Sequence, residues 1–379
     1  MRSVESAPVL DSEALTATAK AIAAVQEADG AIPWYPGGHT DAWDHLECAM
    51  ALDLCGQVDA ADAAWDWLCR NQRADGSWAT SYLGGAVRED FVDSNQCAYV
   101  AAAALHRWLL FGDEEFVTGI WPVVRRALDF VAALQAPTGQ IWWARSADGA
   151  HYPEALLTGC SSTLHSLRCG MALAAVIDEI GSDGGKGGGR SGESGRGRAA
   201  EASARWGRAA DDLHHALLAH PEYFLPKDRW SMDWYYPVLG GALRGSAGQA
   251  RLASQWDTFV VTGLGARCVA DEPWVTGAET CELAIALHMV GETESARRLV
   301  TDMQCLRHAD GGYWTGWQFA DEVFWPVEQS TWTGAAVILA VDTLAGGVTE
   351  QLFRGDDLPA TALTALTART CGCQSQDAA

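Results

Sequence analysis

Residues 292–319 read ETESARRLVTDMQCLRHADGGYWTGWQF, and this stretch carries the pattern that decides the fold. Its first half places apolar residues at the i, i+3, i+4 and i+7 spacing of one helix face and leaves the charges on the other face. These apolar residues are Ala296, Leu299, Val300, Met303 and Leu306. A glycine pair then closes the run, and aromatic residues follow. The stretch predicts a surface helix, a tight turn and an aromatic link.

The same plan recurs three more times along the chain, so the sequence is a repeat. The copies are AAVQEADGAIPWYPGG (23–38), LCRNQRADGSWATSYLGG (68–85) and FVAALQAPTGQIWWARS (130–146). Each link is followed by a second kind of run that is apolar nearly all round, such as CAYVAAAALHRWLL (97–110) and CELAIALHMVG (281–291). These runs are too long for strands, so they predict buried helices.

Alternation of half-exposed and fully buried helices predicts an outer ring of helices around an inner ring. Six such pairs can be counted, and they begin near Ser12, Ala60, Glu114, Ala202, Gln249 and Glu292. The fourth and fifth units lack the Asp-Gly turn, so their assignment rests on periodicity and length alone. The predicted fold is an all-α (α/α)6 toroid, a barrel of six helical hairpins.

The toroid is predicted to form one domain over residues 1–365. Residues 181–204 begin GSDGGKGGGRSGESGRGR, and this glycine, serine and charge content cannot bury apolar surface. We expect a flexible surface insertion there and a disordered tail over residues 366–379.

The net charge, the short motifs and the cysteine content of the sequence exclude some classes of function and favour others. A formal charge of −23 repels phosphate backbones and anionic lipid, which disfavours nucleic-acid and membrane-surface roles and favours a neutral substrate. The sequence contains no phosphate-binding loop and no dinucleotide fingerprint, so we expect no cofactor, and no metal site is expected either. The 11 cysteines, mostly within predicted helices, and the lack of a signal-like start favour a cytoplasmic protein. The oligomeric state stays open.

Acidic residues recur where the buried helices begin. Asp44-His-Leu-Glu47-Cys-Ala matches Glu279-Thr-Cys-Glu282-Leu-Ala almost position for position, and Asp93-Ser-Asn-Gln96-Cys-Ala falls in the same register, with Asp93 at the position of Asp44. The third unit offers hydroxyls without an acid, whereas the remaining units supply Asp93, Asp233 and Glu328. In a closed ring these positions converge on one mouth, which predicts a group of carboxylates around a cavity.

Helix capping is the alternative explanation, because acids in a first turn complement the helix dipole. It does not explain why most of the 18 tryptophans fall in or beside the same links. Indole faces stack on the apolar faces of sugar rings, and carboxylates bind sugar hydroxyls. The candidate stacking platforms are Trp43, Trp143, Trp274 and Trp332.

Paired carboxylates are also the minimal machinery for cleaving a glycosidic bond, since one protonates the leaving oxygen and the other activates water or attacks directly. A group of acids provides for this division of roles, because neighbouring negative charges raise the pKa of one member. The residues therefore favour a glycoside hydrolase.

The six-unit plan resembles the (α/α)6 toroids of several glycoside hydrolase families, terpene cyclases and protein prenyltransferases. More closely, DAWDHLECAMAL (41–52), DFVDSNQCAYV (90–100) and WVTGAETCELAIALHMVG (274–291) are similar to the actinobacterial methylmannose polysaccharide hydrolases, often labelled prenyltransferase-like. This resemblance implies an endo-acting α-mannosidase that cleaves α-1,4 bonds between 3-O-methylmannose units. It also implies that the catalytic acids are Asp44 and Glu279.

Our mechanistic hypothesis from the sequence makes Glu279 the general acid and Asp44 the general base of an inverting reaction, with carboxyl groups about 6.5–9.5 Å apart. Asp93, Asp233 and Glu328 are expected to bind hydroxyls or orient water. Two alternatives stay open: a terpene cyclase or prenyltransferase-like enzyme, whose Asp-rich motifs are absent from the sequence, and a non-catalytic carbohydrate-binding toroid.

Overall fold

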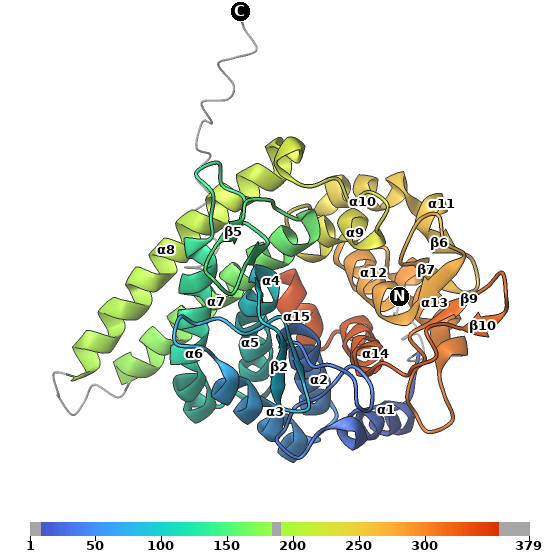
Figure 1. Ribbon diagram of the computed structural model, residues 1–379, viewed down its shortest axis with the longest axis horizontal. Coiled ribbons are helices and arrows are strands. Elements are labelled where there is room, and N and C mark those ends of the chain that lie inside the picture. Colours follow the sequence, from blue (N-terminus) through green and yellow to red (C-terminus); the bar gives the residue numbers. More distant parts are fainter. Residues whose placement is uncertain (1–8, 184–190, 356–379) are drawn as a thin grey trace, which may run out of the picture.

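The computed structural model describes residues 9–183 and 191–355 and has the predicted all-α toroid (Figure 1). The outer helices are α1 (Ser12–Val25), α3 (Val58–Asn71), α6 (Glu114–Ala133), α8 (Ser191–Ala219), α10 (Gly245–Ser254) and α13 (Thr293–Asp302). The inner helices are α2 (Ala42–Leu54), α4 (Ser94–Ala98) with α5 (Val100–Phe111), α7 (Leu157–Asp183), α9 (Ser231–Leu239), α12 (Gly277–Met289) and α14 (Thr331–Leu344). The fourth and fifth units begin earlier than predicted, whereas the other four begin within two residues of the predicted positions.

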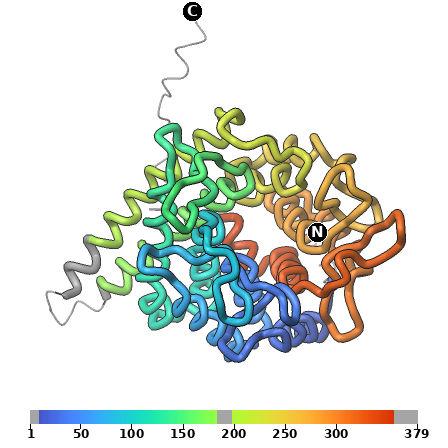
Figure 2. The backbone as a smooth tube through the Cα atoms, in the orientation of Figure 1, coloured from blue at the N-terminus to red at the C-terminus, as the bar shows by residue number. Residues whose placement is uncertain are grey.

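The inner ring is closed. Each inner helix packs on the next, in the order α2, α5, α7, α9, α12, α14 and back to α2. The chain runs once around the ring, so that its first and last units lie side by side (Figure 2). Residues that begin the inner helices are thereby brought to one face although they are far apart in sequence.

A repeated side chain joins the outer helices to one another. Three glutamines at the ends of outer helices donate through Nε2 to the turn glycine of their own unit and to a carbonyl of the next outer helix: Gln26 to Ala60, Gln72 to Val123, and Gln135 to Ala209. In the sixth unit Arg307 takes this position and donates to the Ala14 carbonyl, which links the last unit to the first.

The turns need glycine because each turn lies directly against the backbone of a neighbouring outer helix. Gly30 has φ +94°, and a Cβ there would lie 2.2 Å from the Ala63 carbonyl oxygen. Gly311 has φ +97°, and a Cβ there would lie 2.7 Å from the Ala17 carbonyl oxygen. A side chain at either position would meet both backbone strain and a clash, which explains why the Gly turn recurs.

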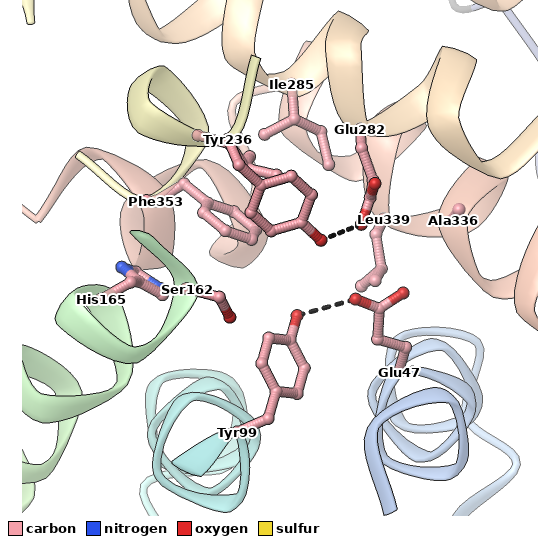
Figure 3. A pocket seen from close by; sticks show the side chains of 12 residues that line it. Glu47, Tyr99, Ser162, His165, Tyr236, Glu282, Ile285, Ala336, Leu339 and Phe353 are labelled. Atoms are coloured by element: carbon pink, nitrogen blue, oxygen red, sulfur yellow. Dashed lines mark hydrogen bonds between the residues drawn. The ribbon is translucent and has the colours of Figure 1, made fainter. Parts of the chain in front are cut away.

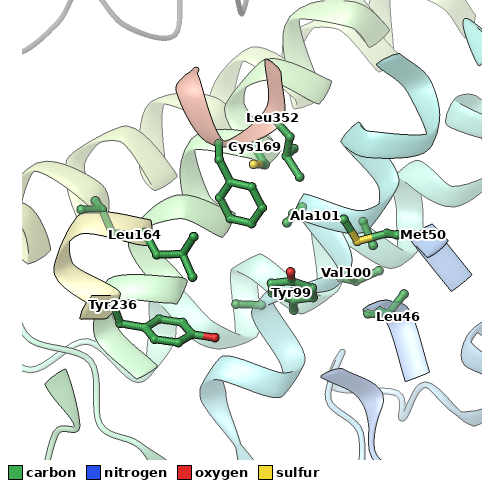
Figure 4. Packing of buried hydrophobic residues seen from close by; sticks show 14 of the residues in the cluster. Leu46, Met50, Tyr99, Val100, Ala101, Leu164, Cys169, Tyr236 and Leu352 are labelled. Atoms are coloured by element: carbon green, nitrogen blue, oxygen red, sulfur yellow. The ribbon is translucent and has the colours of Figure 1, made fainter. Parts of the chain in front are cut away.

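One end of the ring is filled by α15 (Val348–Arg354), which packs against α5, α12 and α14. Its Leu352 belongs to the same hydrophobic cluster as Leu46, Tyr99 and Leu164 of three inner helices (Figure 4). Arg244 donates to the Phe353 carbonyl at 2.6 Å, and the Phe353 ring stacks on His165. The ring is therefore plugged at this end, and the opposite end carries the links.

The links also form short antiparallel strands, which the sequence analysis did not predict. One sheet has the order β10-β9-β8-β7-β6 and comes from the last two units: β6 (Val260–Val261), β7 (Gly265–Arg267), β8 (Trp274–Thr276), β9 (Gly316–Gln318) and β10 (Val323–Phe324). The others are β1 (Ser81–Leu83) with β2 (Ala86–Glu89), and β3 (Val92–Asp93) with β4 (Ala144–Arg145) and β5 (His151–Tyr152). The short helix α11 (Trp256–Phe259) and two 3-10 turns, η2 (Pro221–Tyr223) and η3 (Met303–Leu306), complete the description. Strands this short form where a link folds back on itself and where two links pair, as in β3 with β4 and β8 with β9, and helix periodicity reveals neither.

The structure describes part of the region 181–204, where a surface insertion was expected, as helix. Helix α7 continues to Asp183 and α8 begins at Ser191, and the two pack along their length in a hairpin that projects from the ring (Figure 1). Ala199 and Ala202 of α8 are fully buried, so small residues at helical spacing support this helix despite the polar composition. Residues 184–190, the predicted tail over 366–379 and the predicted domain end at 365 lie outside the described residues.

Within the two described ranges, none of the helices alone is long and apolar enough to cross a membrane; the bent pair α14 and α15 meets this test when taken together.

Candidate active site

Two inner helices, α2 and α12, present acids in their first turns at the link end of the ring. Asp41 is the N-cap of α2, and its side chain accepts hydrogen bonds from the Trp43 and Asp44 amides at 2.9 and 3.0 Å. Capping therefore explains Asp41 and leaves Asp44 free for another role. Thr276-Gly-Ala-Glu279 has the sequence pattern of a capping box, but Thr276, the N-cap of α12, makes no side-chain cap, so the box does not form.

Asp44 and Glu279 line one cleft of about 470 Å³ at the mouth of the ring. Its other walls are Trp34, His39, Asp41, Trp43, Thr80, Ser81, Arg88, Glu89, Gln96, Trp230, Met232, Cys268 and Trp332. We call this the mouth cleft. It combines carboxylates with four tryptophans, a combination that suits a sugar chain with its apolar ring faces and hydroxyl groups.

The predicted site residues divide between this cleft and its surroundings. Asp44, Glu279, Trp43 and Trp332 line the mouth cleft itself. Asp93 and Trp143 line a smaller pocket of about 100 Å³ that shares Trp43 with the cleft.

Asp93 is also the N-cap of α4, because its carboxylate accepts from the Asn95 and Gln96 amides. Its structural equivalent is therefore Asp41, and the register that paired Asp93 with Asp44 is corrected. Gln96, and not Asp93, is the residue equivalent to Asp44, and both Gln96 and Asp44 line the mouth cleft.

The three remaining candidates do not line the mouth cleft. Asp233 is 7% exposed and accepts a hydrogen bond from Thr158 Oγ1 at 2.6 Å. Trp274 lies on β8 and donates from its indole nitrogen to the Trp325 carbonyl at 2.6 Å. Glu328 lines a separate pocket beside α1, because it precedes the N-cap of α14, Ser330, instead of lying in the helix.

The electrostatics single out Asp44 among the acids of the mouth cleft. Burial raises the pKa of Asp44 well above its ordinary value, and the negative charges of Asp41 and Glu47 and a hydrogen bond with Asp41 raise it further. Burial also raises the pKa of Asp41. Asp44 is thus held toward its protonated form, as a proton donor must be.

A second pair of acids lies one helical turn below the mouth, and the sequence analysis did not assign it a role. Glu47 accepts hydrogen bonds from the Trp43 indole at 3.0 Å, the Tyr99 hydroxyl at 2.9 Å and the Trp332 indole at 2.8 Å. Burial raises the pKa of Glu47 to about 7 against the opposing effect of these donors. The signal was the acid three residues after Asp44, which recurs three residues after Glu279.

Glu282 is the partner of Glu47 on α12. It accepts hydrogen bonds from the hydroxyls of Tyr235 and Tyr236, the latter at 2.5 Å. Burial and the nearby charge of Glu47 raise the pKa of Glu282 well above its ordinary value. Figure 3 shows Tyr99 and Tyr236 reaching toward the two acids around an internal cavity of about 20 Å³, which has room for one water. We call Glu47 and Glu282 the floor pair.

Within residues 9–183 and 191–355, no group of three or more His, Cys, Asp and Glu side chains is arranged to hold a metal ion. The chemistry that can be argued from these residues is proton transfer between carboxyl groups and a bound substrate.

Comparison with known proteins gives the site a context. No known protein-family model matches the sequence. The chain is 50% identical over 352 residues to the MMP endo-(1,4)-3-O-methyl-alpha-D-mannosidase of Mycolicibacterium hassiacum, an alignment that covers 93% of this chain and 92% of that protein.

Solved structures with the same fold are more distant. A glycosidase variant in complex with glucose has a TM-score of 0.65 at 15% identity, over 89% of this chain and 99% of that one. A D-mannose isomerase has a TM-score of 0.58 at 11% identity, over 87% of this chain and 96% of that one. At these identities the likeness shows the fold alone, and the fold carries more than one chemistry. The relative at 50% identity decides the family: the chain belongs to the family of the MMP endo-(1,4)-3-O-methyl-alpha-D-mannosidase, a glycoside hydrolase.

Proposed function

We propose that this protein is an endo-acting α-mannosidase that cleaves internal α-1,4 bonds between 3-O-methylmannose units of an oligosaccharide or polysaccharide. The observation that carries the proposal is the 50% identity to a mannosidase named for this linkage and substituent. The mouth cleft supports it independently, since acids from α2 and α12, the two inner helices on either side of α14, line one opening together with four tryptophans.

The electrostatics support Asp44 as the general acid. Its pKa is raised by burial and by the neighbouring Asp41 and Glu47, so it can carry the proton that the leaving oxygen needs. Glu279 is then the second carboxylate, which activates the attacking water. This order reverses the roles that the sequence hypothesis gave to the two residues and keeps the pair itself.

The tryptophans of the cleft supply the binding surface. Trp43 and Trp332 are both held by hydrogen bonds to Glu47, so their indole planes are fixed before substrate arrives. Fixed aromatic faces stack on the apolar faces of sugar rings without a large ordering cost. The O-methyl groups add apolar area worth about 25 cal/mol per Å² buried.

We also propose a cytoplasmic location and an inverting outcome. The described residues include nine free cysteines, six of them buried, as is usual in a reducing compartment. Inversion is tested by proton NMR of the first product, which shows a β anomer in an inverting enzyme and an α anomer in a retaining one.

The direct test is incubation with α-1,4-mannooligosaccharides, 3-O-methylated and unmethylated, followed by mass spectrometry. We expect internal fragments with new reducing ends from the methylated chains. Saturable binding with no fragments would indicate a non-catalytic carbohydrate-binding protein, and release of monosaccharides from one end only would contradict an endo action.

A further inference from the structure

The small pocket beside the mouth cleft matches a substituent of the sugar better than it matches a sugar. It measures about 100 Å³ and is lined by Trp43, Asp93, Ser94, Asn95, Ile141, Trp143, Leu156, Thr158, Gly159 and Cys160. An apolar cavity of about 150 Å³ holds a benzene ring, so this pocket is too small for a pyranose and large enough for a methoxy group. We call it the side pocket.

Trp43 joins the side pocket to the mouth cleft, because it lines both. A sugar stacked on Trp43 in the cleft therefore has one edge beside the side pocket. Trp143, Ile141 and Leu156 give that pocket an apolar wall, which favours a methyl group over a hydroxyl.

A polar group accompanies the apolar wall. Asn95 lines the side pocket, is 5% exposed, and its Oδ1 has no hydrogen-bond partner within the described parts of the chain. A buried acceptor without a donor is costly, and a sugar hydroxyl can supply the donor. In 3-O-methylmannose a free hydroxyl at carbon 2 lies next to the methoxy group at carbon 3, so one sugar edge offers both groups.

We propose that the side pocket receives the 3-O-methyl group of a mannose unit bound in the mouth cleft, and that it makes the enzyme selective for methylated chains. This inference rests on the proposed function and adds the part of the site that reads the substituent. In this proposal the methyl group packs against Trp143, Ile141 and Leu156, and the neighbouring hydroxyl donates a hydrogen bond to Asn95.

Gly159 provides the means to test it. It lies in the first turn of α7, its backbone is outside the left-handed region, and an added Cβ would lie 3.6 Å from Asn95 Cβ and 3.9 Å from Leu156 Cβ, which are ordinary contacts. Gly159→Ala therefore fills part of the side pocket without a clash, and alanine favours the helix. Gly119→Ala is the matched control, since Gly119 is also helical and nothing lies within 4 Å of an added Cβ.

The experiment compares kcat/KM of wild type, Gly159→Ala and Gly119→Ala on methylated and unmethylated α-1,4-mannooligosaccharides of equal length. We expect wild type and Gly119→Ala to prefer the methylated chain. We expect Gly159→Ala to lose about 10- to 200-fold on that chain, the range for one methyl group in an apolar pocket, and to change little on the unmethylated one.

Equal losses of Gly159→Ala on both chains, or no loss on either, would overturn the side-pocket proposal and leave the mannosidase proposal intact. The same holds if wild type cleaves both chains equally well. If wild type cleaves neither chain, the proposed function fails and the side-pocket proposal fails with it.

Discussion

Helices α2 and α12 each carry two acids one turn apart, and the upper and lower acids have different surroundings. Below, Glu47 accepts three hydrogen bonds and Glu282 accepts two, all from tryptophan or tyrosine. Above, Asp44 lines an open cleft and its polar neighbours include another carboxyl group, Asp41. The comparison shows that the groups around an acid, and not the helix that carries it, decide what the acid does. Saturation with donors makes the lower pair structural, and the open side of the upper pair leaves it available for chemistry.

Loss of the second carboxylate should have the largest effect on activity. Glu279→Gln keeps the shape of the side chain and removes the group that activates water, so we expect kcat to fall by about 10²- to 10⁴-fold on every substrate, whatever its leaving group. The melting temperature should stay close to that of wild type, because glutamine keeps the size of the side chain and an oxygen that can accept the hydrogen bond between Glu279 and Cys268. Steady-state rates and thermal unfolding of the same preparation check this, and near-normal activity would remove Glu279 from the mechanism.

Substitution of a floor-pair residue should lower the free energy of unfolding. In Glu47→Gln one oxygen becomes an NH2 group, so at least one of the donors Trp43, Tyr99 and Trp332 loses its acceptor. Near pH 4.5 we expect unfolding to cost about 1–3 kcal/mol less. Urea unfolding measures this, with the lower activity expected from a loosened tryptophan platform as a second readout. An unchanged unfolding midpoint would mean that the floor pair is not structural.

The difference in unfolding free energy between wild type and Glu47→Gln should change with pH in a definite direction. The folded-state pKa of Glu47 is about 7 and its ordinary value is 4.5, so the folded protein holds this proton more tightly. The stability linked to Glu47 is present below about pH 4.5 and is lost as the pH rises toward 7. The wild-type advantage over Glu47→Gln should narrow over this window, and a widening difference would contradict the assignment.

Asp41→Asn should shift a pH profile and leave the helix cap in place, because asparagine caps as well as aspartate. Asp41 raises the pKa of Asp44 by charge and by a hydrogen bond. A general acid fails as the pH rises through its pKa, so removal of Asp41's charge should move the alkaline limb of kcat/KM to lower pH. A shift of that limb to higher pH would show that Asp44 is not the group that titrates there.

The smallest effect is expected from Tyr99→Phe. Glu47 keeps both tryptophan donors in this variant and loses one hydroxyl. We expect a loss of about 1 kcal/mol in unfolding free energy and little change in kcat. Urea unfolding measures the change in stability and initial rates measure kcat. A loss of stability as large as that of Glu47→Gln would mean that Tyr99 is the only donor to Glu47 that contributes to stability.

The sequence predicted most of the ring because each helix carries its own periodicity. The match between Asp44 and Glu279 also placed two residues of one cleft correctly, since equivalent positions in a closed repeat converge. Glu328 lines another pocket for a local reason, because it precedes the N-cap Ser330 and lies in the loop before α14.

Other features depend on contacts between units, which no single segment contains. The sheet of the last two units forms because β8 pairs with β9, more than forty residues later in the sequence (Trp274 with Gln318). The role of the floor pair depends on Tyr99, Tyr235 and Tyr236 from other inner helices. Helix α8 persists through a glycine-rich stretch because α7 packs along it.

The most direct test of the account compares two substrates in Asp44→Asn. One is the methylated α-1,4-mannooligosaccharide, and the other is the same sugar with an aryl leaving group that departs without protonation. If Asp44 is the general acid, the variant should be about 10²- to 10⁴-fold slower than wild type on the first and close to wild type on the second. Equal loss on both substrates, or recovery on the aryl glycoside by Glu279→Gln instead, would contradict the account.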